Sequence, residues 1–215
     1  MNFIKELYTL PLWKRYAQTH EEAYIDHILK NIKTSKFLVE LGAWDGFHLS
    51  NTRYFIEQGF NHILIDGYNH GNQEVKEHFI TKENVVEILE KYNCPKEFDL
   101  LCIDLDGNDI YVLEEVLKNY QPSVICAEFN PIHTESVAIR YNPEHTWNND
   151  NYYGFSFAAG LKLAEKYDYT CVFQNDNLNM YFIHNSHLEG IEVPPVTFQV
   201  THYHVASTKN DWIEY

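Results

Sequence analysis

Four acidic residues stand where four apolar runs of the sequence end. FLVELG contains Glu40, NHILIDG contains Asp66, FDLLCID ends in Asp104 and SVICAEFN contains Glu128. Runs that are apolar at every position, rather than at alternate ones, are typical of parallel strands covered on both faces. The carboxyl ends of such strands meet at one edge of a sheet, where ligands bind in open α/β folds. We therefore expect these carboxylates to share one rim and to face a cationic ligand or a metal ion.

The loop ELGAWDG (40–46) follows the first run and precedes a predicted helix. Its glycines permit a tight turn and the close approach of a ligand, which the helix N–H groups would face. The spacing is G-x-x-x-G instead of the G-x-G-x-x-G of dinucleotide sites, and the Trp side chain fills the pyrophosphate space. The acidic charge suits a cation such as adenosylmethionine, although a tight turn without a ligand is the alternative. The candidate cofactor residues here are Glu40, Gly42, Ala43, Trp44, Asp45 and Gly46.

Two further segments can contact the nucleoside part of such a ligand. Asp66 ends the second run, and an acidic residue at this place can accept hydrogen bonds from both ribose hydroxyls. Farther along, Asn84 and Val85 offer a polar and an apolar contact to an adenine edge. The alternative for Asn84 is that it only helps to cap the helix that begins at Thr81.

The segment DLDGND (104–109) places three carboxylates and an amide within six residues. Their repulsion requires a cationic partner, either the sulfonium ligand, a divalent metal or a basic side chain, although a capped helix N-terminus explains part of the cluster. Asp104 and Glu128, together with Asn130 or Asp106, can hold a hard cation such as Mg or Mn through oxygen ligands. Asp104 is also a candidate contact to the cofactor and a candidate catalytic residue.

A long segment rich in Tyr, Trp, Asn and His (131–153) follows the fourth run. Its length and composition favour an ordered lid over a linker. Within it, His133 is the nearest titratable group that can take a proton from a substrate hydroxyl, with His145 second, although a solvated histidine is the alternative. The residues that we expect to contact the acceptor are Asp106, His133, Arg140, His145 and Trp147.

The elements that must position these residues alternate between strand and helix, which predicts an α/β fold. Helices are predicted over 20–32 (with a capping box, T-x-x-E, from Thr19), 49–58, 81–92, 111–120 and 155–167, with a short helical stretch near 72–79. Strands are predicted over 37–42, 61–67, 98–104, 123–130, 169–174 and 179–184, the last two forming a hairpin. We expect a single domain over 1–215, with an N-terminal helical segment (1–35), a core (36–184) and a C-terminal extension (185–215) packed on the surface.

Composition narrows the function. With 31 acidic against 16 basic residues, the 215-residue chain carries a net charge of −15, which disfavours nucleic acid and anionic membrane surfaces as partners. No run is long and apolar enough to span a membrane, and the first residues do not read as a signal peptide. The four cysteines lack a CxxC pair. Buried free thiols in a reducing cytoplasm are favoured over disulfides or a metal site.

Taken together, ELGAWDG, ILIDG, ENVVEIL, FDLLCIDLDGNDIYVLEEVL and PSVICAEFNP make residues 36–184 resemble the FkbM-type branch of class I adenosylmethionine-dependent methyltransferases. The resemblance implies a Rossmann-like, mostly parallel seven-stranded sheet with an antiparallel last strand and helices on both faces. It also implies a methyl donor held by Glu40, Gly42, Gly46 and Asp66, and hydroxyl acceptors, often on sugars. Related sugar methyltransferases use a divalent metal, and this likeness makes Asp104, Glu128 and Asn130 candidate ligands. Trp44 departs from the smaller residues that are common in the first loop.

The expected function is therefore adenosylmethionine-dependent O-methylation of a sugar or glycan hydroxyl, with a divalent cation as a possible second cofactor. O-methylation of a non-sugar small molecule, such as a phenol, is an alternative, because aromatic and amide side chains suit both kinds of acceptor. A nicotinamide-dependent oxidoreductase would share the layered fold, but this sequence lacks the glycine fingerprint of such enzymes. A non-catalytic nucleoside-binding protein would keep the same pocket.

Overall fold

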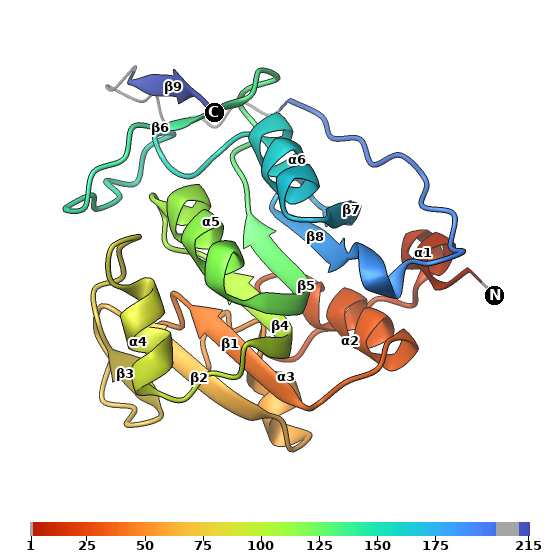
Figure 1. Cartoon of the computed structure of the whole chain (residues 1–215), viewed down its shortest axis with the longest axis horizontal. Coiled ribbons are helices and arrows are strands. Elements are labelled where there is room, and N and C mark those ends of the chain that lie inside the picture. Colours follow the sequence, from red (N-terminus) through yellow and green to blue (C-terminus); the bar gives the residue numbers. More distant parts are fainter. Residues whose placement is uncertain (1, 201–210) are drawn as a thin grey trace.

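A computed structural model describes residues 2–200 and 211–215 of the chain. A seven-stranded sheet runs through the middle of the molecule, between two layers of helices (Figure 1). Its strands lie in the order β3-β2-β1-β4-β5-β8-β7. Their bounds are Phe37–Leu41 (β1), Asn61–Asp66 (β2), Val75–Glu77 (β3), Glu97–Ile103 (β4), Gln121–Glu128 (β5), Tyr169–Asn175 (β7) and Asn179–His184 (β8).

The sheet is parallel except at one strand. β8 pairs antiparallel with both β5 and β7, and every other neighbouring pair in the main sheet is parallel. The predicted Rossmann-like sheet, mostly parallel with an antiparallel last strand, is therefore confirmed. Chain order reverses between β1 and β4, which is the kind of switch point where ligands bind in open α/β sheets.

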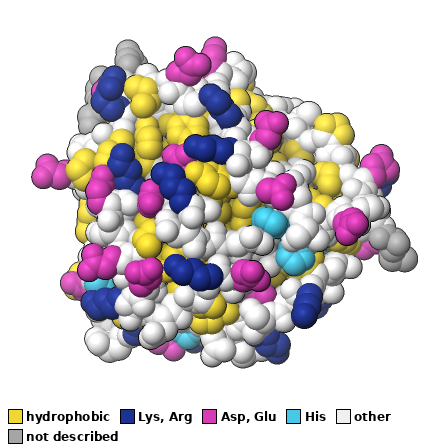
Figure 2. All heavy atoms as spheres, viewed as in Figure 1, with side chains coloured by type: hydrophobic (Ala, Val, Ile, Leu, Met, Phe, Trp, Pro, Cys, Tyr) yellow, Lys and Arg dark blue, Asp and Glu magenta, His cyan; other side chains and the backbone are white. Residues whose placement is uncertain are grey.

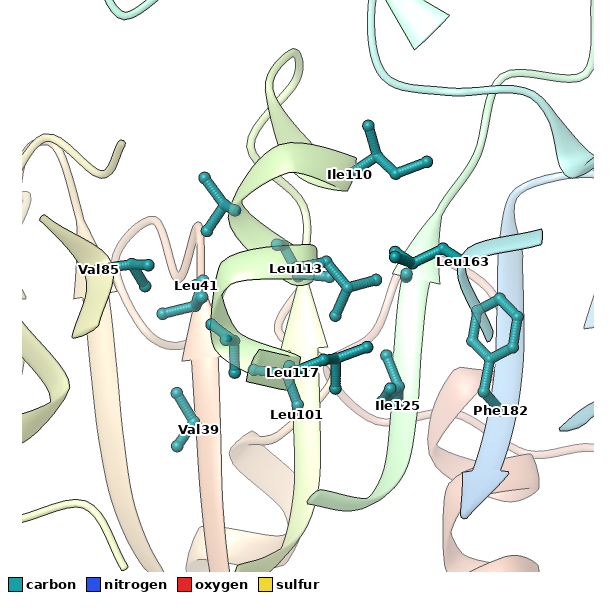
Figure 3. Packing of buried hydrophobic residues seen from close by; sticks show 14 of the residues in the cluster. Val39, Leu41, Val85, Leu101, Ile110, Leu113, Leu117, Ile125, Leu163 and Phe182 are labelled. Atoms are coloured by element: carbon teal, nitrogen blue, oxygen red, sulfur yellow. The ribbon is translucent and has the colours of Figure 1, made fainter. Parts of the chain in front are cut away.

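Helices cover both faces of this sheet, as expected. They are Phe3–Glu6 (α1), Glu21–Asn31 (α2), Arg53–Glu57 (α3), Val85–Lys91 (α4), Asp109–Asn119 (α5) and Phe157–Lys166 (α6), with short 3₁₀ turns at Leu7–Thr9 and Asn185–His187. The buried residues of α4, α5 and α6 form one core cluster with one face of the sheet, and those of α1, α2 and α3 form a second cluster with the other face. Figure 3 shows Leu113 and Leu117 of α5 above Leu101 and Ile125 of the central strands.

Two predicted helices differ from the structure. The short helical stretch at 72–79 is wrong, because β3 lies there: Val75 is buried and the segment pairs with the free edge of β2. The helix predicted over 49–58 shrinks to α3. Residues 50–52 remain outside it because they bind the buried carboxylate of Glu40. Tertiary contacts outweigh weak helix propensity in both segments.

Two helix starts also differ from the expected capping patterns. Thr81 does not cap α4; its N–H instead donates to the side-chain oxygen of Asn84, in a turn before the helix. Thr19 lies one residue before the N-cap position of α2. The expected capping box is absent, because the carboxylate of Glu22 accepts a hydrogen bond from the backbone N–H of Tyr16 instead (3.1 Å).

The lid segment is joined to the C-terminal residues. β6 (Val137–Ile139) pairs antiparallel with β9 (Trp212–Glu214), and the two strands form a small separate sheet. Before β9, the extension runs from beside α1 toward α6 (Figure 1). Lys5 forms an ion pair with Glu192 (2.7 Å), and Phe198 stacks on Phe157 of α6 with 4.7 Å between ring centroids.

Side-chain chemistry at the surface and in the core agrees with the composition. All four cysteines are free and buried. On the face covered by α4, α5 and α6, Lys and Arg side chains are interspersed with Asp and Glu (Figure 2). Among the described residues, no helix has both the length and the apolar composition needed to cross a bilayer.

Candidate functional site

The carboxyl ends of β1, β2 and β4 come together at Gly42. The N–H groups of Gly42 and Ala43 donate to the carbonyl oxygen of Ile65, and the N–H of Asp104 donates to that of Leu41. Gly42 has a φ of +88°, and a Cβ atom there would lie 1.7 Å from the carbonyl oxygen of Asp104. Only glycine permits this approach, so the first loop and the acidic segment share one floor.

Asp66 lies beside this floor with its carboxylate oriented by the backbone. One of its oxygens accepts the N–H of Trp44 (2.8 Å) and the other accepts the N–H of Tyr68 (3.1 Å). Each carboxylate oxygen has two acceptor positions, so each keeps one for a ligand. The Trp44 side chain is 53% exposed and stacks on His70, with 4.3 Å between ring centroids. Asp66 is therefore suited to bind a diol such as the two ribose hydroxyls.

Glu40 lies below the cleft and holds the first loop from beneath. Its buried carboxylate accepts hydrogen bonds from the hydroxyls of Ser50 (2.9 Å) and Thr52 (2.6 Å) and from the N–H of Asn51 (2.9 Å). Burial raises the pKa of Glu40 to about 7, with a smaller contribution from the charge of Asp66 and opposition from these hydrogen bonds. Glu40 reaches the cavity wall, but its three hydrogen bonds already go to the loop.

This burial predicts a pH dependence of stability. The unfolded chain releases the Glu40 proton near the ordinary value of 4.5, and the folded protein releases it only at about 7. Because the folded state binds more protons in this interval, the free energy of unfolding of the wild type should fall as pH rises through it. The expected loss between about pH 5 and about pH 7.5 is about 2 kcal/mol relative to Glu40→Gln. Urea denaturation of both proteins at about pH 5 and about pH 7.5 measures it. A stability difference between the two proteins that does not change with pH would contradict the role of Glu40.

Three carboxylates form the centre of the site. Asp104, Asp106 and Glu128 each offer an oxygen within 4.8 Å of the others. The buried carboxylate of Asp109 accepts the N–H groups of Leu105 (2.6 Å) and of Gly107, which fixes the loop that carries the first two. This arrangement matches the oxygen ligands that Mg²⁺ and Mn²⁺ prefer.

The cluster also holds its protons unusually tightly. Burial raises the pKa of both Asp104 and Glu128, and repulsion among the neighbouring acids raises it further. Burial likewise raises the pKa of Asp106 to about 6. The close carboxylates of Asp104 and Glu128 repel each other, and a cation bound between them would offset this repulsion.

A cleft of three adjoining cavities passes over this centre. Cavities of about 300 Å³ and about 400 Å³ lie on the two sides of Trp44 and Asp66, and a third of about 430 Å³ lies beyond Glu128. Asp106 and Trp147 line all three. The sizes are those of small-molecule sites.

The lid closes over the acidic loop through direct contacts. The ring of His145 lies on Gly107, where a Cβ atom would come within 2.2 Å of it. Asn108 and Asn142 exchange hydrogen bonds between side chain and backbone, and the Trp147 indole N–H donates to the carbonyl oxygen of Asp150 (2.8 Å). His145 and Trp147 therefore line the cleft as the sequence suggested, with Asp106 below them.

Three predicted residues of the second half of the site lie elsewhere. His133 does not line the cleft; its ring packs against Trp212 of β9, with 4.4 Å between centroids, so it is not placed as the catalytic base. Arg140 instead pairs with Asp211 (2.8 Å). Asn130 is fully buried, and its side-chain oxygen accepts the N–H of Ile132, so Asp106 rather than Asn130 completes the cluster of oxygen atoms.

Four predicted cofactor residues support the cleft without lining it. Asp45 accepts the N–H groups of residues 47 and 48, and Gly46 is required because a Cβ would crowd side chains of β2, β3 and the loop before β3. The side-chain amide of Asn84 forms hydrogen bonds within its own turn, and Val85 is fully buried in the core. Asp45 and Gly46 therefore shape the first loop, and Asn84 and Val85 belong to the start of α4, outside the cleft lining.

The wall contains residues that the sequence reading missed. Phe79, which is 52% exposed, and Ile80 line the cavity beside Asp66, at the place expected of Asn84 and Val85. An apolar pair flanked by polar residues is a sequence signal from which this part of the wall could have been predicted. Gln18 lines the other two cavities, and nothing in its local sequence indicated this.

Comparisons with known proteins add one likeness. No family model matches the chain, and no curated protein matches it. A solved structure from Klebsiella pneumoniae, described as that of a "putative O-methyltransferase", is 13% identical, with 84% of this chain and 86% of that chain covered and a TM-score of 0.42.

The class of fold follows from the strand order. Counted along the chain within the main sheet, the strands lie in the order 3-2-1-4-5-7-6, with the seventh antiparallel. This is the Rossmann-like arrangement of the class I methyltransferases, and the cleft lies at the carboxyl ends of its first, second, fourth and fifth strands. The FkbM-type resemblance stays a prediction.

Proposed function

We propose that this protein is an adenosylmethionine-dependent O-methyltransferase. The observation that carries the proposal is that Asp66, oriented by two backbone N–H groups, and the carboxylates of Asp104, Asp106 and Glu128 open into one cleft. A nucleoside-diphosphate cofactor would place its phosphates against this acidic wall, whereas a sulfonium cation is attracted to it.

The residues present fit the donor. Asp66 has free acceptor positions for the two ribose hydroxyls, and Phe79 and Ile80 offer apolar surface to a purine. Gly42 and Trp44 form the wall toward the methionine end, above Glu40. When bound, adenosylmethionine supplies an electrophilic methyl group. The chain then holds the donor and an acceptor hydroxyl in adjoining cavities, and such alignment supplies a large part of a rate gain.

The acid cluster can remove the hydroxyl proton. Without a bound cation, the raised pKa values of Asp104 and Glu128 bring one carboxylate close to the range in which a general base works at neutral pH. This assignment replaces His133. Asp104, Asp106 and Glu128 would hold a divalent cation such as Mg²⁺ or Mn²⁺, which acidifies a coordinated hydroxyl. We take the acceptor to be a sugar or glycan hydroxyl. We also take the protein to be a member of the FkbM-type branch and to act in the cytoplasm.

Calorimetry and methyl transfer test this function. Adenosylmethionine should bind to the purified protein and NADH should not. With isotopically labelled donor, label should appear on hydroxyl groups within a panel of glycosides and phenols. Binding of NADH in preference to adenosylmethionine would instead assign an oxidoreductase, and donor binding without transfer to any hydroxyl would indicate a binding protein.

The cation is a separate prediction with its own readout. Mn²⁺, followed by electron paramagnetic resonance, should bind to the wild type about tenfold or more tightly than to Asp106→Asn or Glu128→Gln, since each change removes one charged ligand. Affinity should rise with pH, because a cation competes with protons for carboxylates whose pKa is raised. Asp45→Asn, which alters a nearby carboxylate outside the cluster, is the matched control. Equal affinity in all four proteins would remove the metal from the proposal.

A further inference from the structure

The cavity beyond Glu128 lies between two parts of the chain that are distant in sequence. Its walls come from Gln18 before α2 and from the lid residues Trp147, Asn149 and Tyr153. Its floor is shared with the acid cluster, through Asp106 and Glu128. It is thus the part of the cleft that lies next to the reacting centre and on the far side from Phe79.

The segment that carries Gln18 is held on its N-terminal side by a buried carboxylate. Glu22 has no exposed surface, and it accepts hydrogen bonds from the backbone N–H groups of Arg15 and Tyr16. Ala17 then pairs with Leu49, which follows the first loop. The backbone before Gln18 is therefore fixed to both α2 and the donor side of the cleft.

A second buried carboxylate holds the segment on its other side. Glu21, also without exposed surface, accepts the N–H and the hydroxyl of Thr19 (both 2.8 Å). The side-chain amides of Asn175 and Asn179, on β7 and β8, donate to the same carboxylate. Burying two carboxylates costs free energy that such hydrogen bonds must offset. The result is a rigid segment that presents Gln18 to the cavity.

The walls of this cavity have a distinct chemistry. Within the described part of the chain, no Lys or Arg lines it, and Lys14, which binds the carbonyl oxygen of Gln18 (3.0 Å), lies outside the lining. Carboxylates from Asp106, Glu128 and Asp150 face amides and the partly exposed ring of Trp147. Without a bound cation, the lining therefore offers no positively charged partner for a phosphate or carboxylate on the ligand.

We propose that this cavity is the acceptor subsite, that it takes uncharged or amino-bearing polyols and rejects anionic ones, and that Gln18 determines this selectivity by hydrogen bonding to ligand hydroxyls. The assignment of the bound polyol as a methyl acceptor rests on the proposed function, whereas the charge selectivity can be measured by binding alone. Amide groups donate to and accept from hydroxyls, and an aromatic face packs against the C–H groups of a sugar ring.

Four probes of similar size test the selectivity. Methyl glucoside, glucosamine, glucuronate and glucose 6-phosphate are titrated by ligand-observed NMR, in the presence of a chelator of divalent cations, against the protein saturated with S-adenosylhomocysteine. The first two should bind at least about tenfold more tightly than the last two. Gln18→Ala should weaken binding of methyl glucoside about 3- to 10-fold, as expected for one lost hydrogen bond. Gln18→Lys should gain affinity for glucuronate, which a misfolded variant would not do.

The controls separate this inference from the proposed function. Gln73→Ala removes an exposed glutamine far along the chain and should leave all four affinities unchanged. Adenosylmethionine affinity, measured by calorimetry in the wild type, reports on the donor side of the cleft separately. Loss of that binding in the wild type would overturn the methyltransferase proposal alone. Equal binding of neutral and anionic probes, no binding of any neutral or amino probe, or an unchanged probe profile in Gln18→Lys would overturn the inference alone.

Discussion

Replacing Asp66 by alanine is expected to weaken adenosylmethionine binding by about 100-fold, as measured by isothermal titration calorimetry. Each hydrogen bond from a ribose hydroxyl to this carboxylate contributes about 1.5–3 kcal/mol, and the change removes both. It also removes the acceptors that orient Trp44 and Tyr68, so the cleft wall loses part of its shape.

Two further variants isolate the ribose contacts from the wall. Asp66→Asn keeps one oxygen as an acceptor and should fall between the wild type and Asp66→Ala. Glu77→Ala removes a carboxylate directly across from Asp66 in the β2–β3 register, outside the cleft lining, and should bind as the wild type does. Unaltered affinity in Asp66→Ala would show that the donor does not lie beside this carboxylate.

Replacing Gly42 by alanine should have the largest effect on the fold at the site. The added Cβ would lie 1.7 Å from the Asp104 carbonyl oxygen, so β1 and β4 cannot keep their spacing at this end. We expect several kcal/mol of lost stability in urea denaturation, or a folded protein that no longer binds adenosylmethionine because Asp104 has moved.

Gly59→Ala is the matched control for this prediction. Gly59 has a φ of +85°, close to the +88° of Gly42, but no heavy atom lies within 4 Å of a Cβ built on it. Alanine at 59 therefore meets only the backbone strain, about 1–2 kcal/mol. Similar stabilities of the two variants would mean that the close approach at Gly42 is not tight.

The sequence predicted the sheet because its strands carry a strong local signal. Runs such as FDLLCID are apolar throughout, so the strand ends and their acids could be placed before any coordinates were known. The strand at Val75–Glu77 carries no such signal. Its pairing depends on the exposed edge of β2, which is a tertiary feature that no local pattern records.

The candidate site was predictable where regular strands position its residues, but not where loops position them. Asp66 and Glu128 end regular strands and Asp104 directly follows one, so their position on the rim is dictated by topology. His133 and Asn130 lie where the chain leaves β5, and there packing against β9 and the lid backbone sets their direction. Gln18 is held at the cleft through the buried carboxylates of Glu21 and Glu22, and the sequence pattern had assigned Glu22 to a capping box instead.

The antiparallel strand β8 affects how the chain folds during its synthesis. Until β8 is available, the outer edge of β5 has no partner, although β1, β2 and β4 can already pair. An emerging chain therefore exposes an apolar strand edge, which invites association with other chains, until the hairpin of β7 and β8 has been synthesised and docks. Because this hairpin also carries Asn175 and Asn179, which bind Glu21, its docking late in synthesis couples closure of the sheet to the anchoring of residues near the start of the chain.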